Sequence, residues 1–219
     1  MIDFKPVYKI VLFDLDGTLT DPGLGITNSV MYALKKFNIE VEDRTSLYKF
    51  IGPPLWDSFD KYYHLSDEEI TRAVAYYREY FSVKGIYENE LYEGIAEMLE
   101  QIKDSGIKVV LATSKPEEFA AEIIRYFHID HYFDFVAGST IDGTRVKKAD
   151  VIAYALESLG ITDLSLTVMV GDREHDILGA KEIGLDSIGV LYGYGSREEL
   201  ENAGATYLAE SVTDIISLI

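Results

Sequence analysis

The chain contains no cysteine, and this absence excludes disulfide bonds, thiolate metal sites and a cysteine nucleophile. Basic residues are also scarce, because 20 Lys and Arg stand against 38 Asp and Glu, giving a net charge of −18. Nucleic acids and anionic membranes bind clustered Lys and Arg, so we expect neither as a partner. The simplest interpretation of the acidity is a soluble surface.

Long hydrophobic runs are missing as well. No stretch approaches the roughly 20 apolar residues that a membrane-spanning helix requires. Residues 1–6 include an early acid and no apolar run, which is unlike a signal peptide. We therefore expect a cytoplasmic protein, and we expect it to be a monomer or a weak homodimer.

Short apolar runs, by contrast, recur along the 219 residues and predict buried strands at 8–13, 107–112, 133–137, 166–170 and 187–191. These runs do not alternate apolar with polar residues, which is typical of a parallel sheet covered on both faces. Helical patterns between the later runs lie at 117–127, 149–159 and 174–183. The pattern predicts a doubly wound, Rossmann-like α/β core whose active site lies beyond the carboxyl ends of the strands.

Residues 20–91, called here the insert segment, carry no strand signal. Helical patterns fill it at 26–37, 55–63 and 67–81, and an unstructured loop of this length is improbable in a compact domain. We therefore predict a core from residues 1–19 and 92–219, with a helical cap domain inserted after the first strand. Its tyrosines are expected to pack between its own helices: Tyr62, Tyr63, Tyr76, Tyr77 and Tyr80.

Two carboxylates follow the first predicted strand. Asp14 and Asp16 are two residues apart, so an extended backbone points both side chains to the same side. Gly17 then allows the chain to turn away from the sheet. An Asp-Gly pair after a strand is equally typical of a plain turn, so the pair alone does not establish a site.

The fourth predicted strand ends in the same way, at Asp172. Asp176 follows one helical turn later and shares a helix face with Ala180 and Ile183, so it can point inward. The alternative is that Asp172 only caps the helix.

Hydroxyl groups follow the second predicted strand. Thr113 and Ser114 precede Pro116, which suits the first position of a helix. Hydroxyls and free amides at such a helix start can bind an anion, although a plain Ser cap is the alternative.

Two lysines precede the predicted helix 149–159. Lys148 lies one turn before Ile152 on the buried stripe of that helix, which directs it toward the sheet edge, whereas Lys147 follows a neighbouring face. A solvated lysine pair is the alternative.

The four aspartates would repel one another if they converged without a positive charge. A set of oxygen ligands favours Mg²⁺, which also accepts the oxygens of a substrate phosphate. A lysine and the two hydroxyls could then hold that phosphate.

Taken in chain order, this set of residues resembles the haloacid dehalogenase superfamily, and in particular phosphatases similar to phosphoglycolate phosphatase and bacterial 5′-nucleotidases. The resemblance implies that Asp14 is the nucleophile and Asp16 the general acid and base. It implies that Mg²⁺ is held by Asp14, the Asp16 carbonyl and Asp172, supported by Asp176. Phosphoryl oxygens would be bound by Thr113, Ser114 and Lys148. Relatives often place proline after the lysine, whereas Ala149 follows Lys148 here, so Lys147 stays an alternative that the buried stripe disfavours.

The resemblance implies hydrolysis of small phosphate monoesters, phosphoglycolate-like or nucleoside monophosphates, through an aspartyl-phosphate. The alternatives are a phosphosugar mutase of the same fold and an inactive regulatory binding protein, while Asp16 argues against a dehalogenase or phosphonate hydrolase. We expect the cap to select the substrate, with Gly52 facing the site in the apolar break at 50–55. Alternatively, Pro53 and Pro54 merely start the next helix.

Overall fold

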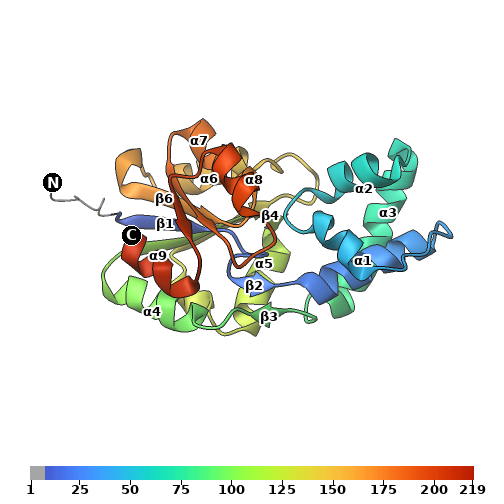
Figure 1. Cartoon of the computed structure of the whole chain (residues 1–219), viewed down its shortest axis with the longest axis horizontal. Coiled ribbons are helices and arrows are strands. Elements are labelled where there is room, and N and C mark those ends of the chain that lie inside the picture. The colour runs from blue at the N-terminus through green and yellow to red at the C-terminus, as the bar shows by residue number, and fades with distance from the viewer. Residues whose placement is uncertain (1–7) are drawn as a thin grey trace.

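The computed structural model describes residues 8–219, and its helices and strands form two regions side by side (Figure 1). One region is an α/β sandwich that includes both ends of the described chain. The other consists of helices from the insert segment. Residues 1–7, which carry the expectation about a signal peptide, lie outside the described residues. Within residues 8–219, no helix combines the length and the apolar character needed to cross a membrane.

The main sheet is parallel and six-stranded, in the order β5-β4-β1-β6-β7-β8. Its strands are β1 (Ile10–Phe13), β4 (Lys108–Pro116), β5 (Phe135–Ser139), β6 (Thr167–Gly171), β7 (Asp186–Val190) and β8 (Tyr207–Ala209). The predicted fold class is confirmed. The sequence patterns missed β8, because it has three residues and only Ala209 is buried.

Helices cover both faces of this sheet, and the buried side chains of β1 explain its apolar run. Val11 and Phe13 belong to the larger core cluster, whereas Leu12 packs in a second cluster on the other face. Successive strand residues point to opposite faces, so a doubly covered strand must be apolar throughout. The covering helices are α4 (Ile95–Asp104), α5 (Glu117–Tyr126), α6 (Lys148–Ser158), α7 (Glu174–Ile183), α8 (Arg197–Ala203) and α9 (Val212–Leu218).

The insert segment leaves and rejoins the α/β region through a small antiparallel pair, β2 (Thr20–Asp21) and β3 (Glu90–Leu91). Two-residue strands are too short to give a sequence signal. Its helices are α1 (Gly23–Lys35), the 3₁₀ helix η1 (Arg44–Phe50), α2 (Leu55–Tyr63), α3 (Asp67–Tyr80) and the π-helical turn η2 (Phe81–Gly85). Ser66 and Glu69 form a reciprocal capping box that starts α3.

One local expectation was wrong. Pro116 is the residue before α5 instead of its first helical residue, because β4 continues in an extended conformation to Pro116. The pairing of β4 with β5 shifts register between Ala112 and Pro116, so the regular alternation of side chains does not extend through residues 113–115.

Candidate active site

Three neighbouring strands bring the predicted site residues to one edge of the sheet. β1, β4 and β6 are adjacent and parallel, so the residues at or just beyond their carboxyl ends share one edge of the sheet: Asp14 and Asp16, Thr113 and Ser114, and Asp172. Asp176 arrives from α7. One carboxylate oxygen from each of Asp14, Asp172 and Asp176 lies within 4.8 Å of the others, and all three side chains are buried. The structure therefore brings three of the four predicted aspartates together, and Asp16 follows Asp14 by two residues.

Lys148 lies among these carboxylates. Its Nζ is 2.9 Å from Asp14 Oδ1 and 2.8 Å from Asp176 Oδ1, and it donates a 2.9 Å hydrogen bond to the Ala112 carbonyl. Burial alone would lower the pKa of Lys148, but the negative charges of Asp14 and Asp176 raise it above its ordinary value. Lys148 is thus a buried ammonium, whereas Lys147 is exposed at the start of α6.

Asp172 does not cap α7, so that alternative is wrong. Its Oδ2 accepts a 2.8 Å hydrogen bond from the Tyr194 amide, and its Oδ1 lies 3.4 Å from the Thr18 hydroxyl. Two other carboxylates cap α7: Asp176 Oδ2 accepts a 3.1 Å hydrogen bond from the Arg173 amide, and Glu199 Oε1 accepts a 2.9 Å hydrogen bond from the Glu174 amide. Burial, together with the charges of Asp176 and Asp14, raises the pKa of Asp172 well above its ordinary value.

Gly17 makes room for this cluster. Its φ of +81° lies in the left-handed region, and a Cβ there would lie 2.1 Å from Asp172 Oδ2. Any larger residue would displace the carboxylate, so the turn after Asp16 requires glycine for two separate reasons.

The donor set fits a hard divalent cation. Asp16 Oδ1 is buried and accepts no hydrogen bond from the described residues, while Asp14 Oδ1 and Asp176 Oδ1 share the single ammonium of Lys148. Lys148 provides one positive charge against the three carboxylates of Asp14, Asp172 and Asp176. A cation with oxygen ligands, such as Mg²⁺, would offset the surplus negative charge of these carboxylates.

Asp16 has its own cation, Lys115, which sequence reasoning missed. Lys115 is buried, and its Nζ lies 2.5 Å from Asp16 Oδ2. Burial raises the pKa of Asp16, although the charge of Lys115 opposes this rise. Periodicity could not have indicated Lys115, because the pairing of β4 with β5 is irregular between Ala112 and Pro116. Thr113 is buried beside Lys115, and its hydroxyl accepts a 3.2 Å hydrogen bond from the Lys115 amide.

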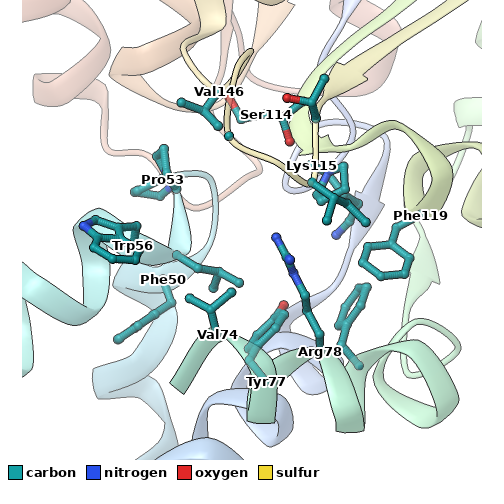
Figure 2. Close-up of a pocket in the computed structure, with 18 of the residues that line it drawn as sticks. Phe50, Pro53, Trp56, Val74, Tyr77, Arg78, Ser114, Lys115, Phe119 and Val146 are labelled. Carbon is teal, nitrogen blue, oxygen red and sulfur yellow. The ribbon is translucent and has the colours of Figure 1, made fainter. Parts of the chain in front are cut away.

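A cavity of about 500 Å³ opens beyond Asp16, between the α/β region and the insert segment. Ser114, Lys115 and Phe119 line it from one side, and Trp56 and Arg78 line it from the other (Figure 2). Sequence reasoning missed Trp56 and Arg78, which follow ordinary helical patterns and become neighbours only in the folded chain.

Four of the five tyrosines named above pack within the insert segment, as expected, and Tyr77 is the exception. Tyr62 and Tyr63 pack on the Phe50 ring, with centroids 5.8 Å and 6.0 Å away. Tyr76 and Tyr80 likewise contact rings of the same segment. Tyr77 stacks on Phe81 but also lines the cavity, so the expectation for it was incomplete. Burial, followed by the negative charge of Asp16, raises the pKa of Tyr77 well above its ordinary value.

Gly52 lines the cavity and also contacts the α/β region. Its φ is +100°, and a Cβ there would lie 2.8 Å from Arg173 Cγ. The Arg173 guanidinium donates to the Ile51 carbonyl and pairs with Glu199 at 2.8 Å. Pro54 directly precedes α2, so the apolar break both starts a helix and contacts the site.

Comparison with known proteins identifies the family. A model described as haloacid dehalogenase-like hydrolase matches residues 11–190. The chain belongs to this family. This haloacid dehalogenase-like hydrolase is 47% identical over 193 residues to a 5′-nucleotidase of Pseudomonas aeruginosa, covering 88% of this chain and 87% of the relative. It is 36% identical over 205 residues to the tyrosine-protein kinase PtkA of Mycobacterium tuberculosis, covering 94% of this chain and 69% of that protein.

A solved structure agrees. The crystal structure of a predicted phosphatase from Clostridium acetobutylicum superimposes with a TM-score of 0.94 at 52% identity, covering 96% of this chain and 97% of that one. The predicted family and fold are confirmed, and so is the prediction of an enzyme of the phosphatase class.

Proposed function

We propose that this hydrolase cleaves phosphate monoesters of small metabolites in a Mg²⁺-dependent reaction through an aspartyl-phosphate on Asp14. The observation that carries the proposal is the separate environment of its two neighbouring carboxylates. Asp14 contacts Lys148 within the buried aspartate cluster, whereas Asp16 contacts Lys115 at the cavity. Two carboxylates in different environments are suited to different roles.

In the proposed reaction, a carboxylate oxygen of Asp14 attacks phosphorus and the bond to the ester oxygen breaks. Asp16 donates its proton to that leaving oxygen, a role that its raised pKa supports. The Asp16 carboxylate then accepts a proton from the water that attacks the aspartyl-phosphate, which releases phosphate and restores Asp14.

The remaining predicted residues would bind the phosphate and the cation. Asp14, Asp172 and the Asp16 carbonyl would hold Mg²⁺, with Asp176 in support. The cation would neutralise charge on the transferring phosphoryl group. Thr113, Ser114 and Lys148 would hold phosphoryl oxygens, because they lie at the same sheet edge as Asp14.

We also propose that the insert segment, residues 20–91, is a cap that selects the leaving group. The cavity lies between it and the α/β region, and Asp16 lines the cavity from the α/β side. A phosphate at Asp14 would therefore direct its leaving group toward the insert segment. Gly52 belongs to this wall, so it is a candidate substrate-binding position.

The test is phosphate release by the purified protein from p-nitrophenyl phosphate, 2-phosphoglycolate, nucleoside 5′-monophosphates, sugar phosphates and pyrophosphate, with Mg²⁺ and with a chelator. We expect Mg²⁺-dependent release from at least one monoester. Conversion of a sugar phosphate into its isomer without phosphate release would instead identify a mutase. Activity that persists fully in chelator would exclude Mg²⁺ from the reaction.

A further inference from the structure

The wall that the insert segment contributes to the cavity is largely apolar and includes four aromatic rings. Phe50, Trp56, Tyr77 and Phe81 line it, and Phe119 of α5 closes it from the other side. Phe81 and Phe119 contact each other edge to face at 5.5 Å. A leaving group of only a few atoms, such as glycolate, would fill little of the 500 Å³ and contact few of these rings. Flat, apolar surfaces of this kind bind a flat ring best.

A single guanidinium projects among these rings. Figure 2 shows Arg78 rising from α3 with its guanidinium in the middle of the cavity. Within residues 8–219, the guanidinium of Arg78 forms no hydrogen bond and no ion pair, although other half-buried arginines do, as in the pairs of Arg145 with Glu117 and Arg173 with Glu199. The chain carries 38 acidic residues, so a half-buried arginine without an acidic partner suggests that a ligand supplies the acceptor.

Guanidinium geometry restricts that ligand. Its planar fork donates two parallel hydrogen bonds to a pair of acceptors on one edge of a planar group. A carboxylate offers such a pair but has no ring for the aromatic wall. A 6-oxopurine offers both, because O6 and N7 lie side by side on a flat bicyclic base, whereas adenine has an amino donor in place of O6.

We propose that Arg78 binds the O6/N7 edge of a 6-oxopurine base, so that the preferred substrates are inosine and guanosine 5′-monophosphates. This inference rests on the proposed hydrolysis at Asp14, because the base would occupy the cavity while the phosphate lies at the sheet edge.

The first test measures binding without catalysis. Trp56 is the one tryptophan of the chain and lines the cavity, so its fluorescence can report inosine, a product that has no phosphate. We expect inosine to bind more tightly than adenosine, and Arg78→Met to weaken inosine binding roughly tenfold while adenosine binding changes little. Arg72→Met is the matched control, because Arg72 lies on the same helix, is exposed, and stacks on Phe37 outside the cavity.

The second test is the ratio of kcat/KM for inosine monophosphate to that for adenosine monophosphate. We expect Arg78→Met to lower this ratio roughly tenfold, and Arg78→Lys, which keeps the charge without the fork, to lower it as well. Arg72→Met should leave it unchanged. An unchanged ratio in both Arg78 variants, or a loss confined to 2-phosphoglycolate, would overturn the inference. Hydrolysis of p-nitrophenyl phosphate by the wild-type protein checks the proposed function separately, since inosine binding needs no hydrolysis.

Discussion

The two sides of the cavity differ in how their charges are satisfied. On the α/β side, Lys148 contacts Asp14 and Asp176, and Lys115 contacts Asp16, so each buried cation already has a carboxylate. On the insert side, the Arg78 guanidinium lies among aromatic rings and has no hydrogen-bond or ion-pair partner among the described residues. Groups arranged before substrate arrives suit chemistry that is the same for every phosphate ester. A group without such a partner, as Arg78 is, suits recognition of the leaving group, which differs from one phosphate ester to another.

The variant with the largest expected effect should lose turnover on the α/β side while keeping ligand binding on the insert side. Asp14→Asn should lower turnover of every phosphate ester by roughly four orders of magnitude or more, because an amide cannot attack phosphorus. The substitution is isosteric, so inosine should still quench Trp56 fluorescence on the insert side. Turnover is measured as phosphate release, in protein checked by mass spectrometry for deamidation back to aspartate. Substantial turnover in such protein would remove Asp14 from the mechanism.

A second variant removes Lys148, the buried cation among the aspartates of the α/β side. Lys148→Met should lower the free energy of unfolding by about 3–5 kcal/mol, because it leaves Asp14 and Asp176 buried without their partner. Urea unfolding in chelator measures this loss. The matched control is Lys147→Met at the exposed neighbouring position, expected within about 0.5 kcal/mol of wild type. Equal losses in both variants would show that Lys148 is not the charge that holds the cluster together.

Metal binding should stabilise the α/β side in a pH-dependent way. At about 100 times its dissociation constant, Mg²⁺ should add about 2.7 kcal/mol to the free energy of unfolding. Burial and the charges of Asp176 and Asp14 raise the pKa of Asp172. The metal-free folded protein therefore keeps a proton that the unfolded chain loses above about pH 4, so its stability falls as pH rises.

Mg²⁺ binds the ionised carboxylate of Asp172. The stabilisation that Mg²⁺ gives should therefore grow as the pH rises above about 4. Thermal unfolding with Mg²⁺ and with chelator, from acid to neutral pH, measures the difference. Asp172→Asn should abolish most of the difference between thermal unfolding with Mg²⁺ and with chelator. A difference that is the same at every pH would contradict this assignment of the cation to the buried aspartates.

The smallest expected effect concerns the contact between the two sides. Gly52→Ala combines a positive φ with a clash against Arg173, so it should shift the insert segment and change the order in which substrates are preferred. Gly106→Ala is the control: its φ is +76° and a Cβ there would contact nothing within 4 Å. Both should lose about 1–2 kcal/mol from backbone strain. If both keep the wild-type order of substrates, the Gly52 loop has no part in selection.

The same contrast explains how much the sequence could predict. Asp14, Asp16, Asp172 and Asp176 were predictable because each follows a strand or starts the next helix, and parallel strands end at one edge. Lys148 was predictable from the buried stripe of its own helix. Lys115 was missed, because its direction depends on how far β4 extends.

The cavity could not be predicted in the same way. Trp56 and Arg78 belong to different helices, and their positions opposite Phe119 depend on how the insert segment packs against the α/β region. Helical periodicity gives the face of one helix but not its partner. The short strands β2, β3 and β8 were missed because two or three residues carry no periodic signal.

The central claim is that Asp14 carries the phosphoryl group while Asp16 moves the proton, and trapping the intermediate tests it most directly. Asp16→Asn should still be phosphorylated by p-nitrophenyl phosphate with Mg²⁺, because this leaving group needs no proton, but its aspartyl-phosphate should hydrolyse slowly. Mass spectrometry of the rapidly acidified protein should then find one phosphoryl group, on the peptide that contains Asp14 and not in the Asp14→Asn, Asp16→Asn double variant. A phosphoryl group on any other residue, or hydrolysis by Asp16→Asn at the wild-type rate with no trapped species, would contradict the account.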